Sequence, residues 1–147
     1  MTMWHLVKRL VGSVTATPLT GEEQSVIAAV LMPREEALFR RLSTADARHA
    51  MSVLRRFDAD MPHASLTARR AALLHDIGKV DDGMGTMLRV IATIVGPRVP
   101  RFRTYHSHEQ RGIELLEVAG SDPETLAYLR GTGDSRVVEA LRRADDI

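Results

Sequence analysis

The 147-residue sequence contains no cysteine, which excludes disulfide bonds, zinc ribbons, iron–sulfur clusters and catalysis by a thiol nucleophile. Aromatic residues are also few, with one tryptophan, two tyrosines and three phenylalanines. No Asn-Gly or similar turn joins two runs of alternating apolar residues, so the signals of β-hairpins are missing. These absences favour an all-α protein. They leave six histidines and nineteen carboxylates for metal or acid–base chemistry.

Neither sign of charge is in excess, because 20 basic residues stand against 19 acidic ones. A protein dedicated to coating nucleic acid needs a clear positive excess, so we do not expect that partner. The longest uncharged apolar run, 90–96, is far shorter than the roughly 20 residues that cross a bilayer. Lys8 and Arg9 interrupt the apolar stretch at the amino terminus, whereas a signal peptide places its charges before it. We therefore predict a cytoplasmic protein without a membrane segment.

The chain has the length of one ordinary domain, which buries about two-thirds of its unfolded surface. Near the amino terminus, apolar residues recur at helical spacing and predict a short amphipathic helix. A linker that contains Pro18 and Gly21 separates this helix from the rest. We therefore expect a helix and linker over 1–20 and the main domain over 21–147. The apolar residues of the short helix are Trp4, Val7, Leu10 and Val11.

Capping signals and helix breakers divide the main domain into helices. Thr20 and Glu23 have the spacing of a capping box, which opens a helix that runs to about Leu31. On a longer helix, His49, Val53 and Phe57 are spaced by four and therefore share a face. The other expected helices are 35–42, one from Ser43 or Thr44 to the break at Pro62, 65–74, 87–95, 105–118, one opened by a second capping box at 121–124, and one from the cap Asp134 to Asp145.

Four residues on or at the ends of these helices carry the chemistry that we consider most informative: His49, His75, Asp76 and Asp145. Imidazole nitrogens and carboxylate oxygens together suit a divalent metal ion. Helices can bring such ligands together in the core of a bundle. Adjacent residues on a helix point in different directions, so His75 and Asp76 can share an ion only where the helix is ending or distorted. Gly78 marks such an ending.

A purely structural interpretation of the same residues is a buried hydrogen-bonded pair of His75 and Asp76, with His49 as a core histidine. That arrangement would bury two neighbouring polar groups for packing alone, which is costly unless they have partners. We therefore favour a metal site over this alternative.

The stretch LLHDIGK, residues 73–79, resembles the signature of the HD-domain superfamily of metal-dependent phosphohydrolases, in its HDIG form. The family pattern is a histidine, a His-Asp pair and a late aspartate, and the resemblance assigns these metal-ligand positions to His49, His75, Asp76 and Asp145. It covers roughly residues 38–146 and is nearest to small stand-alone HD-domain proteins. It implies a compact helical bundle with a short N-terminal helical extension. The implied cofactor is a divalent ion such as Mn, Fe, Mg, Ni or Zn.

The same resemblance suggests how substrate is bound. Lys79 is similar to the lysine after the His-Asp pair that approaches the substrate phosphate or its leaving group, although a helix-end lysine bonded to carbonyls remains an alternative. His108, with Gly112 four residues later, is similar to the His-x-x-x-Gly helix of family members with two metal ions. His106 is two residues from His108 and so on another face of the helix, which allows at most one of the two to point inward.

The sequence departs from the two-metal pattern in one respect. Members with two ions carry a further histidine, often a His-His pair, before the last aspartate, and this chain has no histidine after His108. The segment 128–134 looks shortened. The resemblance therefore implies one tightly held ion, and the loop of the HD-GYP cyclic-di-GMP hydrolases is absent.

Three functions follow from these residues. The first is a metal-dependent phosphohydrolase acting on a nucleotide or another small phosphate ester, in which Asp76 orients water and Lys79 and His108 stabilise developing charge. The second is a non-catalytic, metal-stabilised module that binds a nucleotide or a protein, which the shortened segment favours. The third, a di-iron oxygenase, needs two well-held irons, and the missing histidine argues against it.

His63, in a loop bounded by Pro62, is expected at the surface.

Overall fold

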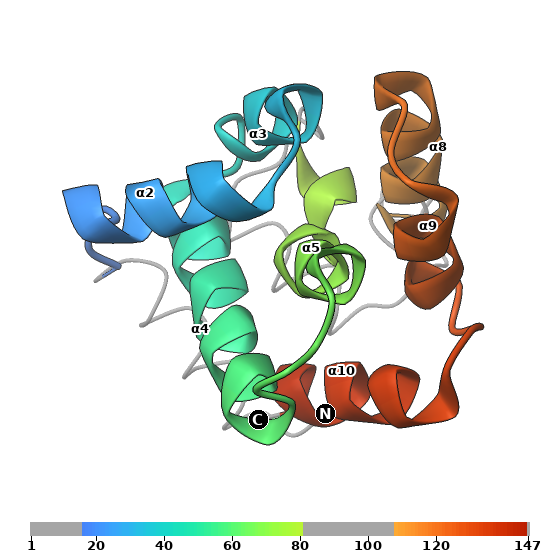
Figure 1. Ribbon diagram of the computed structural model, residues 1–147. Coiled ribbons are helices and arrows are strands. Elements are labelled where there is room, and N and C mark those ends of the chain that lie inside the picture. The colour runs from blue at the N-terminus through green and yellow to red at the C-terminus, as the bar shows by residue number, and fades with distance from the viewer. Residues whose placement is uncertain (1–15, 81–107, 147) are drawn as a thin grey trace, which may run out of the picture.

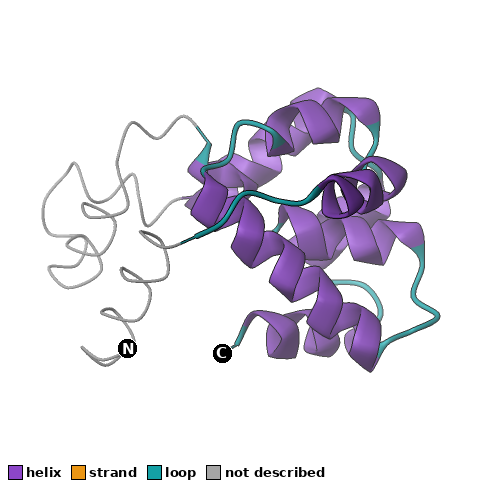
Figure 2. Ribbon diagram, turned by 90° about the vertical axis from the view of Figure 1, so that its left-hand side faces the viewer, coloured by secondary structure: helices purple, strands orange, loops and turns teal. Residues whose placement is uncertain are grey.

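The computed structural model describes residues 16–80 and 108–146, which form α-helices and one 3₁₀ turn and contain no strand (Figures 1 and 2). The all-α fold class is therefore confirmed for these residues. The elements are α2 (Gly21–Val30), α3 (Pro33–Phe39), α4 (Thr44–Asp60), α5 (Leu66–Leu74), η1 (Ile77–Lys79), α8 (His108–Ala119), α9 (Pro123–Leu129) and α10 (Ser135–Asp145).

Three helices begin at the polar residues that the sequence identified as caps. At α2 the Thr20 hydroxyl accepts a hydrogen bond from the Glu23 N–H, and the Glu23 carboxylate accepts one from the Thr20 N–H. The Ser43 hydroxyl caps α4 by accepting from the Asp46 N–H, and the Asp134 carboxylate caps α10. These side chains satisfy N–H groups that no helical carbonyl can reach, which is why the predicted starts are correct.

Two details of the predicted helices are wrong. Ser121 does not open a capping box, because its hydroxyl donates to the carboxylate of Glu35, which is fully buried, at 2.6 Å. Asp122 caps α9 instead, by accepting from the N–H of Glu124. The helix expected over 35–42 ends at Phe39, and the next residues form a tight turn with hydrogen bonds to carbonyls three residues back.

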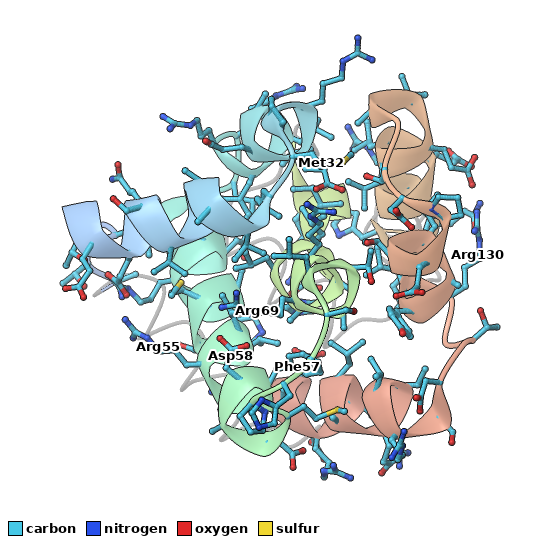
Figure 3. All side chains as sticks on the ribbon, in the orientation of Figure 1. Met32, Arg55, Phe57, Asp58, Arg69 and Arg130 are labelled. Carbon is cyan, nitrogen blue, oxygen red and sulfur yellow. The ribbon has the colours of Figure 1, made fainter. Side chains whose placement is uncertain are left out.

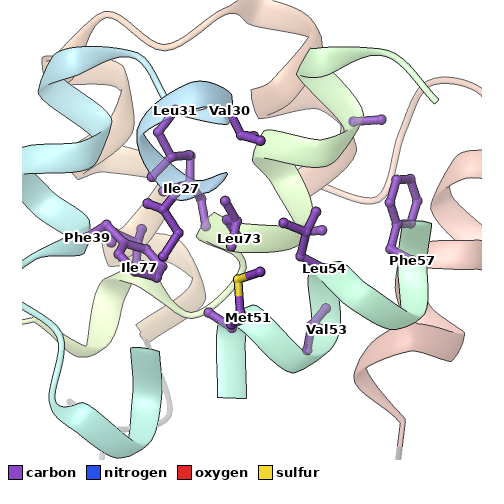
Figure 4. Close-up of a cluster of buried hydrophobic side chains, with 14 of the residues drawn as sticks. Ile27, Val30, Leu31, Phe39, Met51, Val53, Leu54, Phe57, Leu73 and Ile77 are labelled. Atoms are coloured by element: carbon purple, nitrogen blue, oxygen red, sulfur yellow. The ribbon is translucent and has the colours of Figure 1, made fainter. Parts of the chain in front are cut away.

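Helix α5 lies at the centre of the bundle, where α2, α4, α9 and α10 contact it (Figure 1). It can be surrounded in this way because three of its buried residues, Ala68, Ala71 and Ala72, are small. Larger apolar side chains from α2, α4 and η1 fill the space beside it, as Figure 4 shows for Ile27, Leu54 and Ile77. Burial of each large side chain contributes roughly 1.5–3 kcal/mol to folding.

An ion pair also links α4 to α5. The guanidinium of Arg69 donates two hydrogen bonds to the carboxylate of Asp58, at 2.9 and 2.8 Å (Figure 3). A planar guanidinium matches a carboxylate in this two-point geometry, which fixes orientation more firmly than a single contact. The pair therefore helps to set the direction of α5, at whose end the predicted His-Asp pair lies.

Helix α8 packs directly on η1 through two glycines. A β-carbon at Gly78 would lie 1.9 Å from the carbonyl oxygen of His108, and one at Gly112 would lie 3.0 Å from the Gly78 nitrogen. Only glycine allows this approach of two backbones. Gly78 therefore serves close packing, and helix α5 has already ended at Leu74.

Several predictions fall on residues outside the described ranges. They are the amino-terminal helix within 1–20, the helix at 87–95 and the placement of His106. Within the described ranges, no helix is long and apolar enough to cross a membrane. Residues 16–20 have no regular structure before α2 begins at Gly21, and the division of the chain at 20/21 stays a prediction.

Candidate metal centre

Three elements bring the predicted ligand residues together. His49 lies on α4, Asp145 is the last residue of α10, and His75 and Asp76 follow the end of α5. The backbone of Asp76, with φ −110° and ψ 20°, has left the α-helical conformation. The His-Asp pair therefore stands at a helix end, as predicted, and adjacent side chains there can reach the same place. We call His49, His75, Asp76 and Asp145 the His-Asp cluster.

The ligand atoms of the cluster lie close to one another. Oδ1 of Asp145 is 3.0 Å from Nε2 of His49 and 3.1 Å from Nε2 of His75. Nε2 of His75 is also 3.3 Å from Oδ2 of Asp76. The ligand atoms of His49, His75 and Asp76 all lie within 4.8 Å of one another. Nitrogen and oxygen atoms at such separations can contact a single ion.

The hydrogen bonding of His75 indicates what belongs between these atoms. Nδ1 is 2.9 Å from the carbonyl oxygen of Ala72, and because a carbonyl can only accept, Nδ1 carries a proton. In a neutral imidazole, Nε2 then presents a lone pair to the carboxylates of Asp76 and Asp145. Nε2 is buried and has no aligned hydrogen-bond partner among the described residues. Either a second proton or a metal cation relieves this repulsion, so the donor set fits a divalent ion.

The charges of the His-Asp cluster also suit a cation. Burial alone would lower the pKa of His75, but the carboxylates of Asp145 and Asp76 outweigh it and raise the pKa to about 10. Burial opposes ionisation of Asp76, yet His75 and Lys79 hold its pKa well below the usual range. Contacts with His49 and His75 lower the pKa of Asp145 in the same way. Both carboxylates are thus ionised at neutral pH and attract a cation.

Lys79 lies next to the cluster and is almost completely buried, with 9% of its side chain exposed. Its Nζ is 3.1 Å from Oδ2 of Asp76 and 4.0 Å from Oδ1 of Asp46. The ammonium group therefore faces carboxylates beside the cluster. Sequence reasoning did not identify Asp46. Its position three residues before His49 was the available signal, because residues at that spacing share a helix face.

His108 is buried at the first residue of α8, and its backbone contacts Gly78. Among the described residues, the ligand atoms that gather within 4.8 Å of one another come from His49, His75 and Asp76, and the group includes neither His108 nor Asp145, although Oδ1 of Asp145 contacts both histidines. The structure thus brings α8 to the turn that follows the His-Asp pair, and it leaves His108 outside that group. His63 is exposed, as predicted.

The segment that the sequence analysis judged shortened runs from α9 to α10. Its carboxylate at Asp134 accepts a hydrogen bond from the Arg136 N–H and begins α10. Asp134 precedes Asp145 by eleven residues, which places it about 16 Å away along the helix. This carboxylate therefore cannot complete a second metal site beside the His-Asp cluster.

The comparisons with known proteins identify a family. The family model named HD domain matches residues 45–145, which is more than half of the chain. The match includes all four residues of the His-Asp cluster, from His49 to Asp145. No curated protein and no solved structure gives a match.

Proposed function

The chain belongs to the HD-domain family, and from that premise we propose that it is a metal-dependent phosphohydrolase acting on a nucleotide or another small phosphate ester. The observation that carries the proposal is the buried Nε2 of His75, which faces two ionised carboxylates without an aligned hydrogen bond. The four residues of the His-Asp cluster would hold the ion. A divalent ion so held lowers the pKa of water and polarises a phosphoryl oxygen.

The chain's own residues would perform the other steps. Asp76 has one oxygen, Oδ2, near both His75 and Lys79, and its carboxylate can accept a hydrogen bond that orients the attacking water. Lys79 carries a compact positive charge that can stabilise the charge that develops on the phosphate or its leaving group. His108, on the helix that packs against η1, is proposed as a further substrate-binding residue. Asp46, 4.0 Å from Lys79, would keep the ammonium directed at this place.

We also propose one tightly held ion per chain. Among the described residues, histidine and carboxylate ligand atoms gather in one group, that of His49, His75 and Asp76. The carboxylate of Asp134 caps α10 instead. Elemental analysis of the purified, dialysed protein should give about one equivalent of divalent metal. Two equivalents that resist dialysis would contradict this part of the proposal.

The decisive experiment is an assay of a panel of phosphate esters, including nucleotides, with metal-free protein and with protein reloaded with Mn²⁺. We expect turnover only after reloading. Lys79→Ala should keep the metal and lower kcat about a hundredfold, because one electrostatic contact in a shielded site is lost. His49→Ala should lose metal and activity together. Unchanged turnover of Lys79→Ala would reduce that lysine to a structural role.

The second candidate function is a non-catalytic module that the metal stabilises and that binds a nucleotide or protein. The exposed connection between α9 and α10, residues 130–134, supports this candidate because it contains no histidine and its only carboxylate caps a helix. Metal-loaded wild-type protein that retains nucleotides in equilibrium dialysis, but turns over no ester in the panel, would favour this function.

A further inference from the structure

The placement of Asp145 requires an explanation, because this residue ends a helix. The last carbonyls of a helix have no helical partner, so the last turn frays unless other groups hold it. The side chain of Asp145 is 50% exposed, so burial does not fix it. Its Oδ1 nevertheless contacts both His49 and His75. Something outside α10 must hold this turn in place.

Arg56 supplies such a contact. Its Nε donates a hydrogen bond of 2.6 Å to the carbonyl oxygen of Ala144, the residue immediately before Asp145. This carbonyl is among those that the helix leaves without a partner, and the Arg56 charge also complements the negative end of the α10 dipole. Arg56 follows His49 by seven residues, which places both on one face of α4. The same face of α4 therefore holds the backbone before Asp145 and contacts its carboxylate.

We propose that Arg56 is a positioning residue for the metal ligand Asp145, an inference that rests on the proposed metal-dependent function. A terminal nitrogen of its guanidinium is buried and has no hydrogen-bond partner among the described residues. A partly buried arginine is expensive to desolvate, and within residues 16–80 and 108–146 the polar contact that Arg56 makes is the one with Ala144. Fixing the Ala144 carbonyl fixes the direction in which the next side chain leaves the helix.

Arg143, the residue before Ala144, offers a matched control for Arg56. Arg143 of α10 forms an ion pair with Asp60 of α4 at 2.7 Å, and both side chains are exposed. This pair joins the same two helices near the same end of α10, but exposed pairs contribute little. Loss of a generic link between α4 and α10 is thus separable from loss of the Arg56 contact.

The test is a Co²⁺ titration of metal-free protein, followed by visible absorption, for Arg56→Met, Arg56→Lys and Arg143→Ala. We expect Arg56→Met to weaken Co²⁺ binding by about 10–100-fold, as other groups that orient metal ligands do. Arg56→Lys keeps the charge but lacks a donor at the Nε position, so we expect at least a threefold loss. Arg143→Ala should bind within twofold of the wild type. If Arg56→Met does not fold, Arg56→Lys decides the matter.

A double-mutant cycle separates positioning from general stability. In the Asp145→Asn background, Arg56→Met should change Co²⁺ affinity by less than twofold, since its effect passes through Asp145. Wild-type affinity in a folded Arg56 variant, or an equal loss in both backgrounds, would overturn the proposal. If Asp145→Asn itself binds Co²⁺ like the wild type, the proposed metal site fails, and that result is distinct from failure of Arg56 alone.

Discussion

Arg48 and His49 are neighbours on α4, yet their side chains join two different charged clusters. The first, the Glu23 cluster, consists of Glu23, Arg48 and Arg55. The second is the His-Asp cluster that contains His49. Both combine carboxylates with basic groups, and both connect helices that are distant in sequence. They differ in how completely their hydrogen bonds are made.

The Glu23 cluster is complete. One oxygen of Glu23 accepts from the Thr20 N–H at 2.9 Å, and the other accepts from Arg48 at 2.5 Å and from Arg55 at 2.6 Å. The bond from the Thr20 backbone and the contacts with Arg48 lower the pKa of Glu23 to about 2. Arg48 also donates to the carbonyl oxygens of Thr17 and Pro18 and so ties the chain before α2 to α4. Such a cluster stabilises the fold and needs no ligand.

The His-Asp cluster is incomplete in the same terms. Nε2 of His75 lies 3.1 Å from Oδ1 of Asp145, farther than the Glu23 oxygens lie from their donors, and it lacks an aligned hydrogen bond. The comparison teaches that proximity of opposite charges does not identify a functional site. The informative feature is a buried polar atom, Nε2 of His75, that lies between two carboxylates without an aligned hydrogen bond to either.

The largest effect on Mn²⁺ binding is expected from removing the imidazole of His75 from the His-Asp cluster. His75→Ala should abolish tight Mn²⁺ binding, measured by equilibrium dialysis with elemental analysis, because it removes one ligand and leaves two carboxylates facing each other. We also expect a loss of stability of about 2 kcal/mol, since buried polar groups lose their partner. His63→Ala, at an exposed histidine, is the control and should bind normally. Undiminished metal content in His75→Ala would refute the assignment.

The affinity for Mn²⁺ should depend on pH, because the ion must replace a proton on His75. The pKa of His75 is about 10 without metal, so binding at lower pH must displace one proton. Between pH 7 and 8.5 we therefore expect Mn²⁺ affinity to rise by about tenfold for each pH unit. Titrations followed by calorimetry in buffers of different ionisation enthalpy would count the protons released. A pH-independent affinity would contradict the assigned protonation of His75.

The smallest effect on Mn²⁺ affinity is expected from a substitution in the Glu23 cluster. Glu23→Gln should leave Mn²⁺ affinity unchanged and lower stability by about 2 kcal/mol, because two arginines lose a charged acceptor. The pKa of Glu23 is lowered from 4.5 to about 2, so its contribution is fully present above pH 4.5 and disappears as the pH falls towards 2. Thermal unfolding across this range should show a weaker acid dependence in the variant. Equal acid dependence in both proteins would show that Glu23 is not the responsible group.

Much of the fold could be predicted because local signals determine it. Caps such as Thr20, Ser43 and Asp134 act within one turn, so their hydrogen bonds can be read from spacing alone. Ser121 could not be predicted, because its partner Glu35 is distant in sequence and is buried only after α3 packs near α8. The same reason explains the omission of Arg56 and Asp46. Their partners, Ala144 and Lys79, come from other elements.

The site was partly predictable for a related reason. The adjacency of His75 and Asp76 was informative because it makes sense for one ion only at a helix end, and that end is where the structure has it. The distances to His49 and Asp145 depend on how α4 and α10 cross, which no spacing encodes. Gly78 was interpreted as a helix ending for its conformational freedom, whereas its role depends on Gly112 in a helix over thirty residues later.

The contact between Gly78 and Gly112 has a consequence for how the protein can vary. Where side chains separate two elements, substitutions of different volume shift the elements apart or together. Here peptide groups meet peptide groups, and the spacing is set by atoms that every residue shares. Substitutions among the surrounding apolar residues can therefore occur without moving α8 relative to the His-Asp pair. A single methyl group at Gly78 is enough to force them apart.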